Sequence, residues 1–596
     1  MFIGPVFTRE LVTAPRRIRF YVARAIYVAA LLTLVCTAWL LLTGTQDVRN
    51  VGDMARFGAT VFQLLAPLQL ALVLFFSALL TASAVAQEKD RRTLVLLLMT
   101  RLSNSELVLG KLFSSLLQVL VLLMAALPLF MLIGLFGGVS LPQIGWVFAV
   151  TLATALAAGS IGSTFALWRE KTFQTLALVF LLLMFWLAAA ELLIAAGGWG
   201  VRWHGISAAA WGEAISPWRA VLIAARPSVG QAAVIGSYGS PAHLFLGVAA
   251  LITVAANALA MLRVRVWNPS REIQLQTAAG EDVFHKPADS QAADASLAPS
   301  PHAAPQPTRH VWDNPIIWRE IRTWAYGRKV LAIRVAYLVL AALSALGVHA
   351  AATVDLPNRG AIALALAPLL VLSLILVNAL AVTSITTERD LGALDLLLVT
   401  DLTPAEFLFG KLGGVFYVAK EMIVLPAALC IYLWLAGATT AENAFYLIVA
   451  LAIADLFVAT LGVHAGLTYI NSRHAVAVSL GMVFFLFVGI ATCMRIMMSF
   501  GGSFELQLAP FLVFMVGGGI SMFVALGHRN PSAAIGLASI ACPTLTFVAI
   551  TSFLQQQTLG VFLVVVGAYG FTTAAMLIPA VYEFDVASGR TSAAEE

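Results

Sequence analysis

The chain has 596 residues, of which 61% are hydrophobic and 11% charged, whereas about a quarter of the residues in ordinary soluble domains are charged. Apolar runs of 18 or more residues recur along the whole chain, which excludes a soluble globular protein and predicts many membrane-spanning helices. The runs are continuous and do not alternate apolar with polar residues, so a closed barrel is excluded as well. The net charge of +5 says little by itself, and we expect no nucleic-acid partner.

The apolar runs predict an all-α polytopic membrane protein with about 14 transmembrane helices, six in the first part of the chain and eight in the second. All but seven of the 35 Lys and Arg residues fall on one side of this arrangement. That asymmetry places both termini in the cytoplasm of a cell whose inner membrane the chain crosses many times. The seven exceptions are Arg49, Arg56, Arg202, Arg219, Arg226, Arg359 and Arg495. The predicted spans are roughly 22–43, 60–86, 113–135, 145–167, 173–196, 243–262, 331–352, 361–385, 413–436, 444–470, 475–498, 508–527, 533–554 and 559–580.

Composition divides the chain into four segments. Residues 1–265 hold about six spans, and residues 313–500 hold about five. Between them, residues 266–312 include a stretch rich in Ala, Pro and Ser, which predicts a largely disordered cytoplasmic linker. Residues 501–596 hold about three further spans and a short cytoplasmic tail.

One charged stretch occurs twice in the chain, once in each half. Glu88 to Leu112 reads EKDRRTLVLLLMTRLSNSELVLGKL, and Glu388 to Leu412 reads ERDLGALDLLLVTDLTPAEFLFGKL, with twelve of 25 positions identical. In each copy charges close a span, a Leu-rich turn too short to cross follows, and a capping box starts the next helix. The capping boxes are Ser103 with Glu106 and Thr403 with Glu406. We therefore predict a rigid elbow on the cytoplasmic side of each half.

The segments before the first span of each half also match. Gly4 to Tyr27 and Asn314 to Tyr337 share a basic, aromatic pattern with the same internal spacing, typical of a short helix in the membrane interface. Because the first half crosses the membrane an even number of times, both copies enter with the same orientation. The two repeats are therefore predicted to be parallel and related by a pseudo-two-fold axis along the membrane normal.

The duplicated stretch resembles the cytoplasmic elbow of ABC-2-type transporter permeases, and Pro5–Glu10 and Asn314–Glu320 resemble the interfacial segment of that family. The likeness covers about residues 1–200 and 310–500. Where the family usually has Gly-Thr before the Leu run, the first half keeps only Thr93 and the second only Gly392. The resemblance implies a membrane-spanning permease subunit that exports a substrate across the cell membrane. It also implies an elbow that couples the chain to an ATPase, with the residues Glu88, Asp90, Thr100, Ser103, Glu106, Lys111, Glu388, Asp390, Thr400, Thr403, Glu406 and Lys411.

The chain itself is not expected to be an enzyme. A P-loop requires Gly-x-x-x-x-Gly-Lys-Ser/Thr, but the two Gly-Lys pairs here are followed by Leu112 and Leu412. ATP and Mg²⁺ are therefore expected in a separate ATP-binding cassette ATPase, in two copies, and this chain is expected to bind no cofactor or metal. Apart from that ATPase, the bilayer and an unidentified substrate are the expected partners.

Two alternatives remain open: an ion-coupled secondary transporter, and a membrane anchor subunit that no longer transports. The first would use ionisable residues inside spans. Asp455, near the middle of its span, and Glu421 are candidates for a substrate or ion path, with Lys420 beside Glu421 as a possible ion-pair partner.

Two expectations concern burial. Glu88, Asp90, Glu388 and Asp390 are predicted at the water boundary, where truncation costs the fold little because exposed ion pairs contribute only about 0–1 kcal/mol. Cys36, Cys430, Cys493 and Cys542 fall in apolar runs and are predicted to be small buried hydrophobes.

Overall fold

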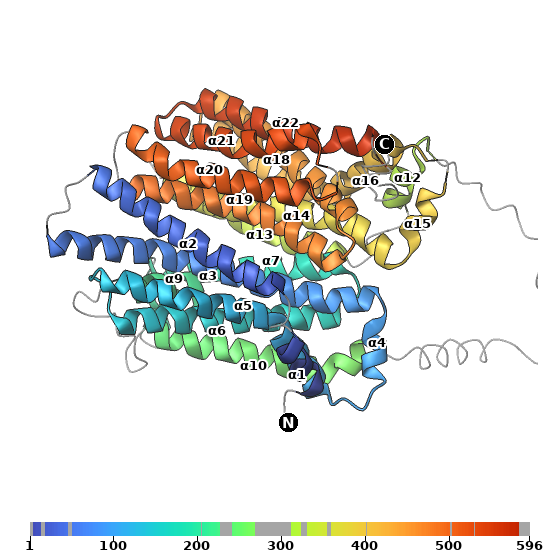
Figure 1. Ribbon diagram of the computed structural model, residues 1–596, viewed down its shortest axis with the longest axis horizontal. Coiled ribbons are helices and arrows are strands. Elements are labelled where there is room, and N and C mark those ends of the chain that lie inside the picture. Colours follow the sequence, from blue (N-terminus) through green and yellow to red (C-terminus); the bar gives the residue numbers. More distant parts are fainter. Residues whose placement is uncertain are drawn as a thin grey trace, which may run out of the picture.

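The long apolar runs form a bundle of roughly parallel and antiparallel helices in the computed structural model of the chain (Figure 1). The structure describes residues 4–13, 18–45, 50–198, 200–203, 206–226, 241–268, 312–322, 330–353, 359–400, 402–500, 504–529, 531–582 and 584. The predicted linker over 266–312 and the tail beyond 584 lie almost entirely outside these residues.

The first half, up to residue 268, consists of helices and one short hairpin. The hairpin is a two-stranded antiparallel addition to the predicted all-α fold, and it pairs Arg202 with Ser207. The elements are α1 (Gly4–Thr13), α2 (Ile18–Thr45), α3 (Val51–Asp90), α4 (Thr93–Leu98), α5 (Asn104–Leu135), α6 (Leu141–Trp168), α7 (Thr172–Gly198), β1 (Arg202–Trp203), β2 (Ile206–Ser207), α8 (Ala208–Ile215), α9 (Pro217–Ala225) and α10 (Pro241–Trp267).

The second half, from residue 312, repeats much of this order. Its elements are α12 (Pro315–Arg322), α13 (Val330–Ala352), α14 (Arg359–Asp390), α15 (Ala393–Leu398), α16 (Pro404–Val418), α17 (Lys420–Leu435), α18 (Ala441–Thr468), α19 (Ser472–Phe500), α20 (Phe504–Leu526), α21 (Ala533–Leu554) and α22 (Thr558–Tyr582). The ends of α3 and α14, the whole of α4 and α15, and the starts of α5 and α16 fall at matching positions of the two copies of the duplicated stretch.

Within the described residues, twelve helices are long and apolar enough to cross a membrane, or thirteen if the bent pair α16 and α17 counts as one span. The bend between these two helices is 60°. The multi-pass membrane character predicted from composition is thus confirmed, whereas the count of 14 and its division into six and eight are not. The remaining predicted span, 508–527, falls on α20, of which Met515–Leu526 counts among the shorter apolar helices.

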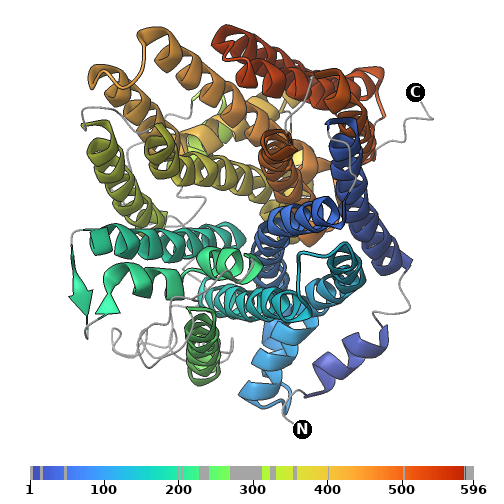
Figure 2. The ribbon, with the colours of Figure 1, turned by 90° about the vertical axis from the view of Figure 1, so that its left-hand side faces the viewer.

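Most contacts between the halves are reciprocal, apart from the packing of α2 on α20. Helix α3 packs against α19 while α7 packs against α14, and α2 packs against α19 while α13 packs against α7. Exchanging each helix for its counterpart in the other half leaves this set of contacts unchanged, as at an interface with two-fold symmetry. Seen from one end, the helices of the first half (blue to green) and of the second (yellow to red) form two adjoining groups (Figure 2). Aromatic rings fill the junction at membrane level, where Phe75 stacks on Phe484 with centroids 4.3 Å apart.

Inside each half a close helix crossing has a glycine at the same relative place. A Cβ added to Gly162 of α6 would lie 2.9 Å from the carbonyl oxygen of Ala78 in α3. In the second half, a Cβ added to Gly462 of α18 would lie 2.9 Å from the carbonyl oxygen of Asn378 in α14. Small residues let two helix backbones approach closely. In a membrane the hydrophobic effect does not drive helices together, so their association depends on such close packing.

The cysteine prediction is partly wrong. Cys430 and Cys542 are buried, but Cys36 is exposed on the surface of α2. An apolar run specifies that a residue lies in the membrane, and it does not say whether the residue faces protein or lipid. The side chain of Cys493 lies outside the described residues.

Candidate functional site

Two elbows, residues 88–112 and 388–412, lie at the same end of the long helices, where Figure 1 shows α4 and α15. We call this the elbow end. In each elbow the chain leaves the long helix through one residue in the left-handed region, at φ 59° for Arg92 and φ 70° for Gly392. That conformation is free of strain only for glycine, so it explains a glycine at this position and makes Arg92 the strained member.

Both predicted capping boxes are present. The Ser103 backbone N–H donates to Glu106 Oε2 at 3.0 Å, and the Glu106 N–H donates to Ser103 Oγ at 3.3 Å. The matching distances in the second elbow are 2.9 Å from the Thr403 N–H to Glu406 Oε2 and 3.2 Å for the return bond. These bonds satisfy backbone donors at the start of α5 and α16, so each elbow turns sharply into its next long helix.

Thr100 and Thr400, which the family resemblance assigns to the coupling with an ATPase, make hydrogen bonds within their own elbows. Thr100 donates its hydroxyl to the carbonyl oxygen of Leu97 at 2.6 Å, and Thr400 does the same to Leu397. Each hydroxyl therefore ends the short helix, α4 or α15, by satisfying one of its last carbonyls.

Lys111 and Glu88 form an ion pair that ties α5 to the end of α3 in the first elbow. The side chains are 14% and 28% exposed, so the pair lies at the edge of the bundle and not in open water. The Lys of the Gly-Lys pair folds back onto Glu88, so this carboxylate is partly covered and paired at the edge of the bundle.

The second elbow buries a larger charged network. Lys411 is 1% exposed and donates to Glu320 Oε1 at 2.7 Å and to the Ser384 carbonyl at 3.3 Å, while its Nζ lies 2.7 Å from Glu388 Oε1. Arg319 pairs with both Glu320 and Glu388. Two cations and two carboxylates thus balance within the protein, and all three donors of the ammonium group are directed at oxygen atoms.

This network contradicts the expectation that Glu388 can be truncated at little cost. The Glu388 side chain is 17% exposed, and that of Glu320 is 1% exposed. Burial by itself would raise the pKa of Glu320, but the Lys411 ammonium and Arg319 hold that pKa below its ordinary value. Removing one member of such a group leaves an uncompensated buried charge, which is far more costly than losing an exposed pair.

Glycines explain why α12 reaches the second network. A Cβ on Gly410 would lie 2.7 Å from Ile316 Cβ, and a Cβ on Gly414 would lie 2.7 Å from Glu320 Cβ. Real side chains do not approach this closely, so α12 settles on α16 only because these positions have no side chain. Asn314 starts α12 there by donating to the Glu406 carbonyl at 2.9 Å.

The first half keeps the glycine at the first of these two positions, Gly110, but not at the second. At the position of Gly414 stands Ser114, and Phe113, one residue earlier, meets Phe7 of α1 edge-on with centroids 6.1 Å apart. Helix α1 also packs against α5, and a Cβ on Gly4 would lie 2.8 Å from Glu106 Cβ.

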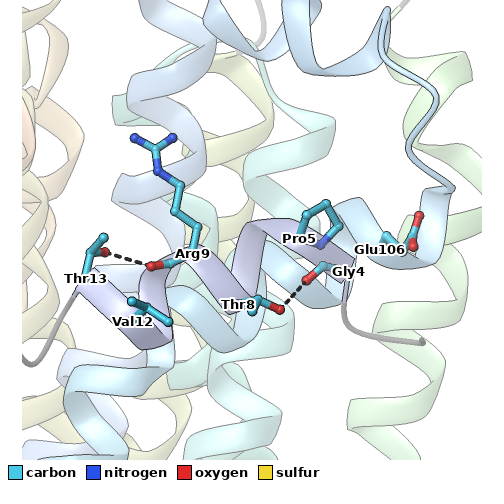
Figure 3. A pocket seen from close by; sticks show the side chains of 7 residues that line it. All are labelled: Gly4, Pro5, Thr8, Arg9, Val12, Thr13 and Glu106. Carbon is cyan, nitrogen blue, oxygen red and sulfur yellow. Dashed lines mark hydrogen bonds between the residues drawn. The ribbon is translucent and has the colours of Figure 1, made fainter.

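A hollow of about 570 Å³ lies beside α1 (Figure 3). Arg9, the counterpart of Arg319, extends from the helix away from Glu106. Among the described residues Lys111 pairs with Glu88 and not with Glu10, the counterpart of Glu320. The two elbows share their backbone course but differ in how tightly they are held.

Sequence reasoning missed a second tie that both elbows share. Lys89 donates to the carbonyl oxygens of Leu167 and Arg169, and Arg389 donates to those of Leu467 and Tyr469. The donors and the acceptors occupy matching positions in the two halves, so an alignment of the two halves of the sequence could have indicated these contacts.

The halves also meet at the elbow end through polar contacts. Arg91 Nε lies 3.1 Å from Asp390 Oδ1, and Gln87 donates to Asn471 Oδ1 at 3.0 Å. Asp90 instead accepts a hydrogen bond from Thr172 at 2.5 Å, within its own half. The Asp390 side chain is 4% exposed, and Asp90 is hydrogen-bonded to Thr172. Both aspartates were predicted to lie free at the water boundary, and neither does.

Exposed apolar side chains occupy the outer surface of each elbow. Leu96 and Met99 are 65% and 66% exposed in the first, and Leu396 and Val399 are 74% and 83% exposed in the second. The two pairs occupy matching positions of the duplicated stretch. Beneath the first, Leu94 is buried in a small core with Val85 and Leu107, and Leu394 is likewise buried.

The two intramembrane candidates lie in different surroundings. Asp455, in the middle of α18, is 1% exposed and lies 3.5 Å from Ser373 Oγ, and its Oδ2 has no hydrogen-bond partner among the described residues. Glu421 pairs with Arg334 at 3.4 Å, while Lys420 lies over the Tyr417 ring. The suggested Lys420–Glu421 pair is thus replaced by Arg334–Glu421.

Glu421 owes its position to the break between α16 and α17. Arg334 also reaches the freed carbonyl of Val418 at 3.3 Å. In the first half, where Leu120 and Val121 occupy the places of Lys420 and Glu421, α5 continues without a break from Asn104 to Leu135.

Comparison of the chain with models of known protein families and with curated proteins gives no match.

Proposed function

We propose that the chain is the membrane-spanning permease of an ATP-binding cassette transporter, exporting a substrate by means of a separate ATPase subunit that holds ATP and Mg²⁺. The observation that carries the proposal is the pair of elbows. Their helix boundaries match position by position, and each elbow presents two exposed apolar side chains at one end of the bundle. Exposed apolar groups that recur at equivalent places are suited to binding a protein partner.

The contacts behind each elbow support a mechanical role. A force on α4 reaches α3 directly, α5 through the pair Glu88–Lys111, and the α6–α7 turn through Lys89. In the second half, Glu388–Lys411 and Arg389 make the corresponding connections. Packed side chains and ion pairs of this kind can carry coupling between a surface site and the helices behind it.

The elbow residues are therefore proposed to have two kinds of role: exposed apolar side chains bind the partner, and polar or charged side chains hold the elbow in shape. Leu96, Met99, Leu396 and Val399 contact the ATPase. The capping boxes, the threonines, and the charged residues Glu88, Asp90, Lys111, Glu388, Asp390 and Lys411 hold the elbow in shape. This assignment places the elbow end in the cytoplasm of a cell with the chain in its inner membrane, consistent with the side on which most Lys and Arg residues lie.

The substrate path is proposed to run between the halves, with opening at the elbow end requiring the contacts Arg91–Asp390 and Gln87–Asn471 to separate. These are polar contacts at the end of the junction, whereas rings such as Phe75 and Phe484 pack at membrane level. Polar contacts near water exchange readily for hydration, so this end can open at lower cost than the aromatic junction.

The test is ATP hydrolysis and transport by the purified complex of the chain with its copurifying ATPase. The double variant Leu96→Ser with Leu396→Ser should lower ATPase binding about tenfold or more, as expected when an apolar anchor is truncated. The matched control is Leu135→Ser with Leu435→Ser, which changes 83% and 71% exposed leucines at the far ends of α5 and α17. An equal effect of both double variants, or no effect of the first, would contradict the proposed elbow contact.

A further inference from the structure

A single carboxyl group lies buried near the middle of α18, where the proposed function gives it no role. Asp455 is 1% exposed, and its Oδ1 lies 3.5 Å from Ser373 Oγ of α14. Its Oδ2 has no hydrogen-bond partner, and no basic side chain pairs with it in the described part of the chain. An ionised carboxylate in such surroundings is far more costly than a neutral one, because nothing nearby compensates the charge.

The groups that face Asp455 are hydroxyls and carry no positive charge. Tyr337 of α13 is fully buried and interacts with both Asp455 and Ser373. Its hydroxyl donates to the Met422 carbonyl oxygen of α17 at 3.0 Å. That carbonyl is free to accept because Pro426, four residues later in the helix, has no N–H. The phenol hydrogen is therefore engaged elsewhere and does not neutralise the carboxyl group.

Charged residues on the helices packed against α18 have partners of their own. On α17, Glu421 pairs with Arg334, and Lys420 lies over an aromatic ring. On α16, Lys411 belongs to the network of the second elbow. On α18 itself, His464 lies 2.9 Å from a carbonyl oxygen of α20. No Lys, Arg, His, Asp or Glu occurs in residues 360–387 of α14, 475–494 of α19 or 558–582 of α22.

The first half has no carboxyl group at the equivalent place. Val73 and Ala155 stand where the second half has Ser373 and Asp455, and both belong to one buried apolar cluster. The same helix crossing is thus apolar in one half and holds an acid in the other. Because an apolar pair packs this crossing in the first half, packing alone does not account for the acid in the second.

We propose that Asp455 is a proton-binding site, protonated in the packed state described here and deprotonated when α14 and α18 separate enough to admit water. The release is an acid dissociation, in which the carboxyl O–H bond breaks and the proton passes to water. A proton needs no ligand beyond the carboxyl group, whereas hard metal cations take about six or more oxygen ligands. Proton uptake thus favours the packed state of the second half, and this linkage does not depend on an ATPase partner.

The test compares thermal unfolding of the full-length wild-type chain and of Asp455→Asn, both purified in a non-ionic detergent. Asparagine resembles the neutral carboxyl group in shape and cannot ionise. The unfolded wild-type chain loses the proton above about pH 4 whereas the folded chain keeps it, so raising the pH favours unfolding. Relative to the variant, the unfolding equilibrium constant of the wild type should rise by up to about tenfold per pH unit, until the folded carboxyl group ionises as well. Parallel pH curves for the two proteins would overturn the proposal.

Infrared absorption tests the proton directly, and it serves also if Asp455→Asn fails to fold. In an ester-free detergent near neutral pH, the carbonyl band of a protonated carboxyl group should be present in the folded wild type and lost on unfolding. The double variant Ser373→Val with Asp455→Ala, which copies the first half, should lack the band. A wild type without the band, or a band that remains in the double variant, contradicts the assignment to Asp455.

A metal ion is the competing occupant, and exchange of salt cations tests it. Replacing N-methylglucamine chloride by sodium or potassium chloride at constant ionic strength and alkaline pH should shift the melting temperatures of wild type and Asp455→Asn equally. Selective stabilisation of the wild type by sodium or potassium would show that a metal ion, and not a proton, neutralises the carboxyl group.

Discussion

Replacing Lys411 by Met should destabilise the chain much more than replacing Lys111 by Met, although the two lysines occupy equivalent places. Lys411 is 1% exposed and neutralises Glu320 and Glu388, so its removal should cost about 3–5 kcal/mol, as for breaking a buried ion pair. Lys111 is 14% exposed and its partner Glu88 28% exposed, which reduces the expected cost toward about 1 kcal/mol. Methionine has nearly the length of lysine, so the comparison isolates the charge.

The pH dependence of the same variants tests the cause. In the wild type the pKa of Glu320 is held below its ordinary value, so its stabilising contribution is present above about pH 4.3 and lost as the pH falls through the lower folded pKa. Without the ammonium, burial raises that pKa, and the carboxyl takes up a proton more readily in the folded state. The deficit of the Lys411→Met variant relative to wild type should therefore be largest near pH 7.5 and shrink toward pH 4.

The assay is unfolding of the detergent-purified chain in increasing SDS, followed by tryptophan fluorescence at both pH values. Equal shifts for the Lys411 and Lys111 variants would refute the argument that burial decides the cost. A Lys411→Met deficit that does not change with pH would show that packing, and not charge, is responsible.

Two further predictions concern glycine positions, both measured by thermal unfolding of the purified chain in detergent. Arg92→Gly should stabilise and Gly392→Arg destabilise the chain, each by about 1 kcal/mol, because both positions have positive φ; changes of the same sign would contradict this reading. Gly414→Ser should displace Glu320 and cost about 1–3 kcal/mol, the usual range for overpacking, whereas the reverse change Ser114→Gly should be nearly neutral. If Gly414→Ser leaves the thermal stability unchanged, the packing of α12 on α16 does not depend on a glycine at this position.

The sequence alone determined the features that depend on neighbouring residues. Apolar runs longer than the hydrocarbon core predicted the many membrane-crossing helices, although the predicted span 413–436 is divided between the bent helices α16 and α17. The capping boxes were predictable because Ser103 and Glu106, like Thr403 and Glu406, stand three residues apart and meet whenever a helix starts between them. The short helices α4 and α15 followed from Leu runs too short to cross the bilayer.

Only the tertiary structure decided which charges are buried and with whom. Lys411 and Glu320 are 91 residues apart, and Arg319 and Glu388 are 69 apart. No short-range pattern in the sequence therefore predicts that these residues are in contact. They meet because α12 lies directly on α16 where Gly410 and Gly414 have no side chain, whereas Ser114 stands at the position of Gly414 in the first half. A duplicated stretch thus shares its helices and caps, since these are local, while its buried charges differ, since they depend on how closely distant segments can approach.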